Sequence, residues 1–274
     1  MQTTNPQVAA IQLNSGTNVN ANLLAAEKML EQAAQQGITL AVLPENFAYM
    51  GAECQDANVI CEPAGEGPLQ TFLSRLAARL GIWIVGGTIP LATSASNKWR
   101  SSSLIYDANG TQVGRYDKQH LFDVNLPDNN QSYHESATIE PGDHICVIDT
   151  PVGKLGLAIC YDLRFPELFR RLMDQGAEII AVPSAFTAVT GKAHWKTLVR
   201  ARAIENLAYV IAAGQGGYHV EGNETYGHSM IVDPWGTLKD QCERGTGHAI
   251  ATIDLAYQQR TRQNFPCLTH RRIT

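Results

Sequence analysis

Short apolar runs alternate along the chain with longer stretches in which apolar residues recur every three or four positions. The short runs are typical of buried strands and the longer stretches of amphipathic helices. The expected strands cover residues 8–13, 39–43, 82–85, 102–106, 112–117, 155–159, 178–182, 208–213 and 248–253. The expected helices cover residues 18–36, 68–80, 166–175 and 192–206, with a short helix and a basic tail at the end. This alternation predicts largely buried sheets with helices outside.

Turn residues punctuate these elements. Gly37 stops the first helix, Pro68 opens the second, and Gly81 caps it. Residues 107–110 (DANG) and 233–236 (DPWG) stand between apolar runs and predict two hairpins. Residues 46–66 and 120–143 have no periodicity, and long irregular loops inside compact domains tend to be functional.

A faint internal repeat relates the two halves. Residues 37–47 resemble residues 176–186, and residues 104–111 resemble residues 230–237. The alternative is chance similarity between two strand-turn patterns. With one sheet per half, packed face to face under outer helices, the expected fold is a four-layer α-β-β-α sandwich of the α/β class. We expect a single domain over residues 1–274, with halves at about 7–143 and 144–254 and a tail at 255–274.

Composition excludes several classes of protein. With 44% hydrophobic and 17% charged residues, the chain is not largely disordered, and a net charge of −5 gives no sign of a nucleic-acid or membrane partner. Residues 1–7 contain neither a basic nor an apolar segment, so we expect no signal peptide, and no apolar run approaches the length of a membrane span. The six cysteines are scattered without a C-x-x-C pair, which predicts free thiols in a reducing cytoplasm and argues against structural zinc.

Three residues are candidates for chemistry. Cys160 ends a buried strand just before a helix, where backbone N–H groups and nearby cations would favour the nucleophilic thiolate; the alternative is an inert buried cysteine. Glu45 follows an apolar strand and would act as a general base if desolvated, or else be a solvated loop residue. Lys118, at the end of the first hairpin, could stabilise an oxyanion or simply be solvated. In the proposed repeat Glu45 aligns with Ser184, and Cys160 lies near the position of Gln12. Glu45 and Cys160 would then come from related strand ends and face each other where the two halves meet.

The blocks at residues 43–45 (LPE), 116–121 (YDKQHL) and 160–167 (CYDLRFPE) resemble the three signature blocks of the nitrilase superfamily of carbon–nitrogen hydrolases, in the same order. The resemblance covers nearly the whole chain. It implies the four-layer sandwich and a Glu45–Lys118–Cys160 triad without metal or organic cofactor. It also implies that the backbone N–H of Tyr161 joins Lys118 at the oxyanion, and that Glu135 supports Lys118 or the substrate.

Other residues are weaker candidates. The resemblance points to Arg164, Phe186, Thr190 and His194 as substrate-binding residues. Arg164 could instead pair with Glu167. His194 could suggest a Cys-His dyad, but no orienting Asn or Asp is evident in the sequence, and we favour a pocket or helix-start role.

Another set is more simply explained by structure. Residues 200–206 (RARAIEN) lie on a predicted helix, and we expect a buried structural ion pair among Arg200, Arg202 and Glu205 rather than contact with the substrate. His228 is expected to be a satisfied strand histidine.

Several motifs in the second half are similar to the branch of the superfamily that contains deaminated-glutathione amidase, with an ω-amidase acting on α-ketoglutaramate and α-ketosuccinamate as its neighbour. The first implies release of 2-oxoglutarate and Cys-Gly, and the second implies release of ammonia. Ser184 and Ala185, together with residues 233–235 (DPW), favour the first. An N-carbamoyl amino-acid hydrolase, a true nitrilase and a non-catalytic scaffold are the alternatives. Lys192 departs from the proline usual in this branch and puts the leaving group in doubt. The family also implies a homodimer or a higher homo-oligomer.

Overall fold

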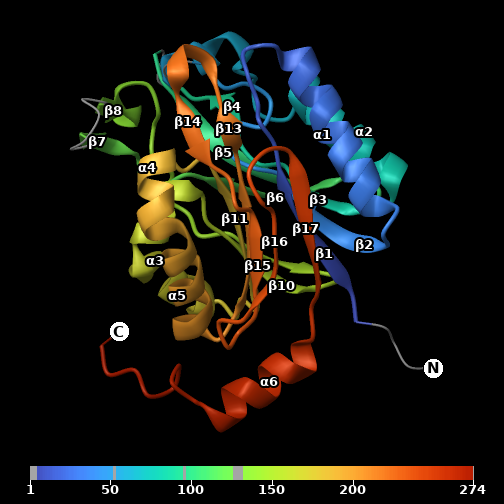
Figure 1. Ribbon diagram of the computed structural model, residues 1–274, viewed down its shortest axis with the longest axis vertical. Helices are drawn as coiled ribbons and strands as arrows, with labels where there is room; N and C mark the ends of the chain where they lie inside the picture. Colours follow the sequence, from blue (N-terminus) through green and yellow to red (C-terminus); the bar gives the residue numbers. More distant parts are fainter. Residues whose placement is uncertain (1–4, 52–53, 95–96, 126–131, 274) are drawn as a thin grey trace.

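Two β-sheets face each other, each covered by a pair of helices on its outer side (Figure 1). The computed structural model describes residues 5–51, 54–94, 97–125 and 132–273. The first sheet has the strand order β17 (Gly247–Thr252), β1 (Gln7–Gln12), β2 (Ile38–Val42), β3 (Trp83–Val85), β5 (Trp99–Tyr106) and β4 (Ile89–Ala92), with β6 (Gln112–Asp117) also paired to β5. The second has the order β16 (Leu238–Gln241), β15 (Met230–Val232), β12 (Tyr209–Gly214), β11 (Ile179–Ser184), β10 (Gly153–Leu157) and β9 (Val147–Thr150).

The helices lie where the periodicity predicts them. Those outside the first sheet are α1 (Val19–Ala34) and α2 (Pro68–Leu80), and those outside the second are α3 (Pro166–Asp174) and α5 (Lys196–Asn206). The Asn18 side chain caps α1 by accepting from the N–H of Ala21 at 3.1 Å. Gly81 ends α2 in the left-handed region at φ 64°, as its sequence position predicts.

Alternation along β1 explains why there are two cores. Val8 and Ala10 point toward the second sheet and belong to a cluster that continues through that sheet to residues of α3 and α5. Ala9 and Ile11 point the other way and pack against α1 and α2. Because successive side chains on a strand face opposite sides, an apolar strand of this kind is buried on both faces. The four-layer α-β-β-α arrangement is therefore confirmed.

The two sheets have the same internal order. Strands β1, β2, β3 and β5 follow one another as β10, β11, β12 and β15 do, with β6 and β16 as hairpin partners of β5 and β15. Helices α1 and α3 connect the first parallel pair of each sheet, and α2 and α5 the second. We propose on this basis that the chain is one domain made of two related halves.

Some elements were not expected from the hydrophobic pattern. Residues 120–143, predicted to be irregular, include the short strands β7 (Asp123–Asn125) and β8 (Ser132–His134) and a 3₁₀ turn at Glu135–Ala137. A second small hairpin joins β13 (Gly216–Tyr218) to β14 (Glu224–Tyr226), and residues 46–66 contain a 3₁₀ helix at Cys54–Ile60. The helical segment expected from residue 192 starts earlier, with α4 (Ala188–Thr190) and a π turn at Gly191–Trp195. Elements of three or four residues are too short to carry a periodic signal.

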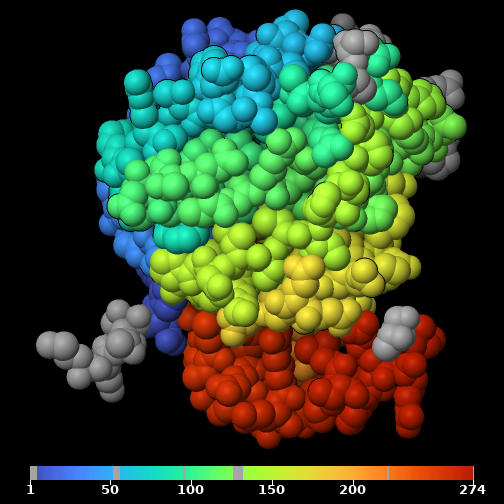
Figure 2. Space-filling model, turned by 180° about the vertical axis from the view of Figure 1, so that it is seen from behind, coloured from blue at the N-terminus to red at the C-terminus, as the bar shows by residue number. Residues whose placement is uncertain are grey.

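The end of the chain forms a separate layer. Helix α6 (Leu255–Asn264) and the residues after it lie across one end of the sandwich, as the red surface in Figure 2 shows. Arg262 anchors this layer by donating to the carbonyl oxygens of Leu207 at 3.0 Å and Ala177 at 3.1 Å. No helix in the described part of the chain is long and apolar enough to cross a membrane.

Candidate active site

Cys160 begins a tight turn between β10 and α3. The strand ends at Leu157, the chain turns through a 3₁₀ helix at Cys160–Arg164, and Pro166 starts α3. Cys160 itself has φ 45°, in the left-handed region that non-glycine residues rarely adopt. A strained residue at a strand-to-helix turn is a common feature of functional sites. The thiol side chain is 8% exposed.

A buried carboxylate holds this turn in place. Asp162 accepts hydrogen bonds at Oδ2 from the Tyr116 hydroxyl and the Ile159 N–H, both at 2.8 Å. At Oδ1 it accepts from the His120 N–H at 3.1 Å and lies 2.7 Å from the His120 Nδ1. Asp162 is fully buried, and it ties the turn that carries the cysteine to the segment on either side of Lys118. The sequence analysis did not identify Asp162 as a positioning residue.

Lys118 lies between two carboxylates. Its Nζ is 2.8 Å from the Glu45 Oε1 and 2.9 Å from the Glu135 Oε1. Glu45 follows β2, Lys118 follows β6, and Glu135 lies in the 3₁₀ turn after β8, so three separate segments meet here. Lys118 and Glu45 are only 1% and 3% exposed. Glu135 also accepts from the Phe122 N–H at 2.8 Å, which fixes its second oxygen.

The backbone of Glu45 is held by the other half of the chain. Gln215, just after β12, donates from Nε2 to the Glu45 carbonyl oxygen at 3.0 Å and to the Ser15 hydroxyl at 2.9 Å. Its Oε1 accepts from the Ser15 N–H at 3.0 Å, and the Ser15 hydroxyl donates to the Phe47 carbonyl oxygen at 2.8 Å. All four residues of this small network are buried. No local motif around Gln215 predicts that it holds Glu45, because its partners Ser15 and Glu45 are about 200 and 170 residues away in the sequence.

Burial and charge set the protonation of the site. Burial, followed by the negative charge of Glu45, raises the pKa of the Cys160 thiol well above its ordinary value, although Lys118 and the backbone N–H of Ala185 lower it. A cation and a backbone N–H thus act in the predicted direction, but the expectation that they would favour the thiolate overall is wrong. The dry surroundings and the adjacent carboxylate outweigh the lysine.

The lysine and the second glutamate are perturbed in opposite senses by the same burial. Burial would lower the pKa of Lys118, but Glu135 and Glu45 together raise it well above its usual value, so the amine stays charged. Burial raises the pKa of Glu135, and Lys118 offsets part of that rise. A cation between two carboxylates leaves this site with no spare positive charge for a resting thiolate.

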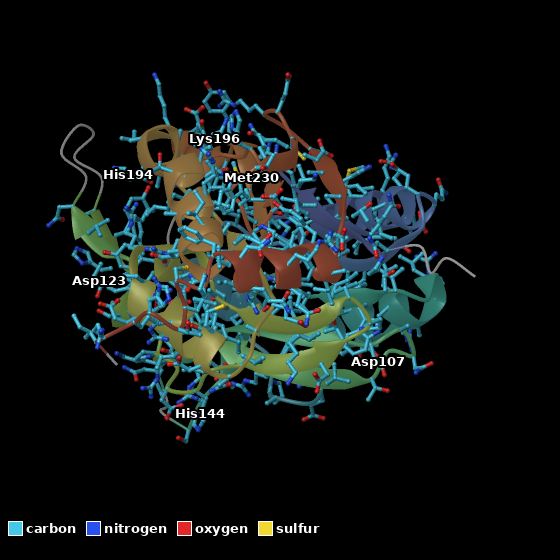
Figure 3. All side chains as sticks on the ribbon, turned by 90° about the horizontal axis from the view of Figure 1, so that it is seen from below. Asp107, Asp123, His144, His194, Lys196 and Met230 are labelled. Carbon is cyan, nitrogen blue, oxygen red and sulfur yellow. The ribbon has the colours of Figure 1, made fainter. Side chains whose placement is uncertain are left out.

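A cavity of about 480 Å³ opens above these groups. Of the residues predicted for the site, it is lined by Glu45, Lys118, Glu135, Cys160, Tyr161, Arg164, Phe186 and Thr190. His194 lies outside the lining on the exposed side of the π turn, as its peripheral position in Figure 3 shows. Its ring Nδ1 is 3.3 Å from the Nη1 of Arg164, which does line the cavity.

Arg164 presents a cation to the cavity. Its guanidinium lies 5.4 Å from the ring centroid of Phe186 and 5.7 Å from that of Tyr161. Within the described ranges it makes no ion pair with an acidic side chain, so the alternative of a pair with Glu167 is not what the structure contains. An arginine stacked between aromatic rings and facing a cavity is suited to bind a carboxylate.

The arginines of α5 have structural partners. Arg202 pairs with Glu205 at 2.7 Å and donates from Nε and Nη2 to the Leu163 carbonyl oxygen, at 2.9 and 2.7 Å, so it supports the turn after Cys160. The expected ion pair is present for these two residues, but only Arg202 is buried and Glu205 is partly exposed. Arg200 is not part of it, because its Nε donates to the Gly236 carbonyl oxygen instead. His228 has a partner for its ring Nδ1 in the Tyr226 carbonyl oxygen at 2.8 Å.

The cysteines form no bridge where they are described. Cys61, Cys146, Cys160, Cys242 and Cys267 are free thiols, and the Cys54 side chain lies outside the described residues. In the described part of the chain, no group of three or more His, Cys, Asp or Glu side chains is arranged to hold a metal ion.

Comparison with known proteins finds similar sequences and structures over nearly the whole chain. The carbon–nitrogen hydrolase family model matches residues 7–263. The deaminated glutathione amidase of Yersinia enterocolitica is 44% identical over 98% of this chain and 93% of its own length. Among solved structures, Saccharomyces cerevisiae Nit3, a member of branch 10 of the nitrilase superfamily, is 34% identical with a TM-score of 0.88, covering 99% of this chain and 98% of that one. The Caenorhabditis elegans NitFhit protein is 37% identical with a TM-score of 0.87, and 99% of this chain covers 66% of that longer chain.

Proposed function

The chain belongs to the carbon–nitrogen hydrolase family, and from that premise we propose that it hydrolyses deaminated glutathione to 2-oxoglutarate and Cys-Gly through a thioester on Cys160. One observation carries the proposal. A nucleophile, a carboxylate base, a buried ammonium and an arginine held beside two aromatic rings line a single cavity. Relatives that are named deaminated glutathione amidase support the choice of substrate.

In the first half-reaction, Glu45 takes the proton of the Cys160 thiol as the sulfur adds to the amide carbon. A neutral resting thiol fits its raised pKa, and it makes proton transfer part of the attack rather than a prior step. The tetrahedral oxyanion is stabilised by the Nζ of Lys118 and the backbone N–H of Tyr161. When the C–N bond breaks, Glu45 returns the proton to the departing nitrogen and leaves a thioester.

The second half-reaction uses the same groups. Water gives a proton to Glu45 and adds to the thioester carbon, and the oxyanion again lies between Lys118 and Tyr161. Collapse breaks the C–S bond, the proton passes from Glu45 to the sulfur, and the acid leaves. Glu135 keeps Lys118 in position through the 2.9 Å contact with its Nζ and does not exchange a proton itself.

The substrate's 2-oxo acid carboxylate is assigned to Arg164, with Phe186 and Thr190 forming the adjoining wall. A cavity of about 480 Å³ falls in the usual range for small-molecule sites. It has room beyond a short monoamide, which favours a dipeptide leaving group over ammonia. His194 would act only by orienting Arg164.

One assay separates the candidate activities. We expect faster 2-oxoglutarate release from deaminated glutathione than from α-ketoglutaramate. Faster release from α-ketoglutaramate would favour an ω-amidase. Cleavage of an N-carbamoyl amino acid alone would favour an N-carbamoyl amino-acid hydrolase. No turnover of any of them by a folded protein would favour a scaffold. With Arg164→Met, KM for the carboxylate substrate should rise far more than kcat falls.

We also propose that the protein forms a homodimer. Three large apolar side chains are exposed together at one end of the second sheet: Ile204 on α5, Trp235 in the β15–β16 turn and Phe265 after α6. The rings of Trp235 and Phe265 meet edge to face at 5.7 Å, so the patch is continuous. Exposed apolar patches of this kind mark interaction sites. Sedimentation should give a dimer for the wild type and a monomer for Trp235→Glu, and a wild-type monomer would refute the proposal.

A further inference from the structure

Thr225, on the small hairpin of β13 and β14, is a cavity residue with a constrained hydroxyl. It lines the cavity that contains Cys160, and its side chain is 3% exposed. Its Oγ1 lies 2.7 Å from the Nε2 of His219. No motif in the sequence draws attention to either residue.

The tautomer of His219 decides which way that hydrogen bond runs. The His219 Nδ1 is 2.7 Å from the Ser15 carbonyl oxygen, and a carbonyl oxygen only accepts, so Nδ1 carries the ring hydrogen. In the neutral ring Nε2 is then an acceptor, and the Thr225 hydroxyl must donate to it. Burial lowers the pKa of His219, which favours this neutral form.

The hydroxyl therefore has only lone pairs left for a ligand. A threonine free to rotate can donate or accept, but here its single hydrogen is already committed. Toward the cavity, Thr225 is an acceptor, and the group that satisfies it must be a donor. A substrate N–H fits this requirement, whereas an ester oxygen or a carboxylate in the same place would face a second lone pair.

The position of Thr225 relative to the nucleophile is set by the neighbouring chain. The Ala185 N–H contacts the Cys160 thiol, the Phe186 carbonyl accepts from the Tyr226 N–H at 2.9 Å, and Thr187 bridges Thr225. Thr225 therefore lies beside the segment that passes Cys160, and both residues line the same cavity, so one bound substrate can contact both.

The same histidine is linked to the catalytic base. Ser15, whose carbonyl accepts from His219, also bonds Gln215, which in turn holds the Glu45 carbonyl. The orientation of the Thr225 hydroxyl and the position of Glu45 thus depend on one network. His219 acts through Thr225 and is a positioning residue.

From this geometry we propose that Thr225 is a specificity-determining residue that accepts a hydrogen bond from an N–H group of the amide substrate's leaving portion. The inference rests on the proposed amidase function and adds a rule to it. The site selects substrates that place a donor at Thr225 and discriminates against oxygen analogues of the same shape. In deaminated glutathione two N–H groups qualify, that of the scissile amide and that of the Cys-Gly peptide bond.

The test compares matched substrates with matched variants. Thr225→Val keeps the shape and removes the acceptor, and Thr225→Ser keeps the acceptor. Kinetics are measured with deaminated glutathione and with two analogues in which oxygen replaces either the scissile N–H or the peptide N–H. Thr261→Val is the control, because its hydroxyl donates to the Tyr257 carbonyl within α6 at 2.9 Å.

We expect Thr225→Val to lower kcat/KM for deaminated glutathione by about 5- to 100-fold, the usual cost of an unpaired polar group. The loss should disappear for one of the two oxygen analogues, and Thr225→Ser and Thr261→Val should behave like the wild type. Leaving the His219 Nε2 unpaired could also lower activity, but this loss would affect all substrates alike. It would therefore cancel in the ratio of kcat/KM between deaminated glutathione and an oxygen analogue. An equal loss with all three substrates, or no loss with any, overturns the proposal.

This outcome is separate from the fate of the proposed function. Wild-type turnover of deaminated glutathione tests the function, and the change in substrate ratio tests Thr225. If the wild type hydrolyses only α-ketoglutaramate, the same comparison is made with that amide and its methyl ester. Thr225→Val must then lower the amide rate relative to the ester rate, and an unchanged ratio overturns the inference.

Discussion

Replacing Lys118 with methionine removes the one positive charge that lies between the Glu45 and Glu135 carboxylates. At 2.8 and 2.9 Å and an effective dielectric constant near 20, each contact has a gross Coulomb energy of about 6 kcal/mol. Much of this Coulomb energy offsets the cost of desolvating the charges, and breaking a buried pair typically costs a net 3 to 5 kcal/mol. We therefore expect Lys118→Met to lower the free energy of unfolding by ~4 kcal/mol. Part of the lost free energy of unfolding is recovered when one of the two carboxylates takes up a proton.

The catalytic consequence of Lys118→Met has two measurable parts. Loss of an oxyanion donor should lower kcat by about 100- to 1000-fold. Loss of the cation should also raise the pKa of the Cys160 thiol further, since Lys118 is one of the groups that lower it. The rate of Cys160 alkylation by iodoacetamide should therefore reach half its maximum at a higher pH than in the wild type.

The control is Lys154→Met, which removes an exposed lysine from β10, the strand that leads to Cys160. It should leave kcat and the alkylation profile unchanged. The reasoning fails if Lys118→Met retains kcat within tenfold of the wild type, or if its alkylation profile coincides with that of Lys154→Met.

Three further predictions concern the nucleophile and its supports. Acid-quenched wild type should carry an acyl group on Cys160 during turnover, and Cys160→Ala should be folded, unacylated and inactive; measurable turnover by the variant would rule out the assignment. Asp162→Asn removes the negative charge and replaces one carboxylate oxygen with an NH₂, which then faces two of the four donor contacts, so kcat should fall more than tenfold and the unfolding temperature by about 10 °C; an unchanged melting curve would contradict this. Because the folded-state pKa of His219 is lowered from 6.5, its contribution to stability is complete above that pH and is lost as pH falls through the lowered value. Thermal melts against pH should then show the wild type losing stability in acid relative to His219→Gln, and parallel curves would argue against it.

The fold was largely predictable because its signals are local and repeated. Helix α2 has the predicted bounds, since a proline opens it and a glycine at φ 64° ends it. The hairpin between β5 and β6 follows from a DANG turn between apolar runs. The short strands β4, β13 and β14 were not predicted, because they are strands through their pairing partners and not through their own sequences.

The chemical groups were found in the sequence, but their protonation was not. Glu45, Lys118 and Cys160 could be recognised from three short blocks in a fixed order. The sign of the thiol pKa shift was wrong, because it depends on how dry the site is and on which charge lies nearest. The dryness of the site and the nearest charge are properties of the packed structure, and they cannot be read from the composition of the chain.

What the sequence determined by itself is most of the strands and helices, the four-layer arrangement, and the candidates for nucleophile, base and lysine. These follow from periodicity, turn chemistry and short motifs, each contained within a few residues. Only the tertiary structure decided which neighbours support them. Asp162 clamps the cysteine turn, Gln215 holds the Glu45 backbone from the other half, and His219 orients Thr225. Each of these contacts joins residues 6 to 170 positions apart, and pairs such as Gln215 and Glu45 meet only when the two sheets close on each other.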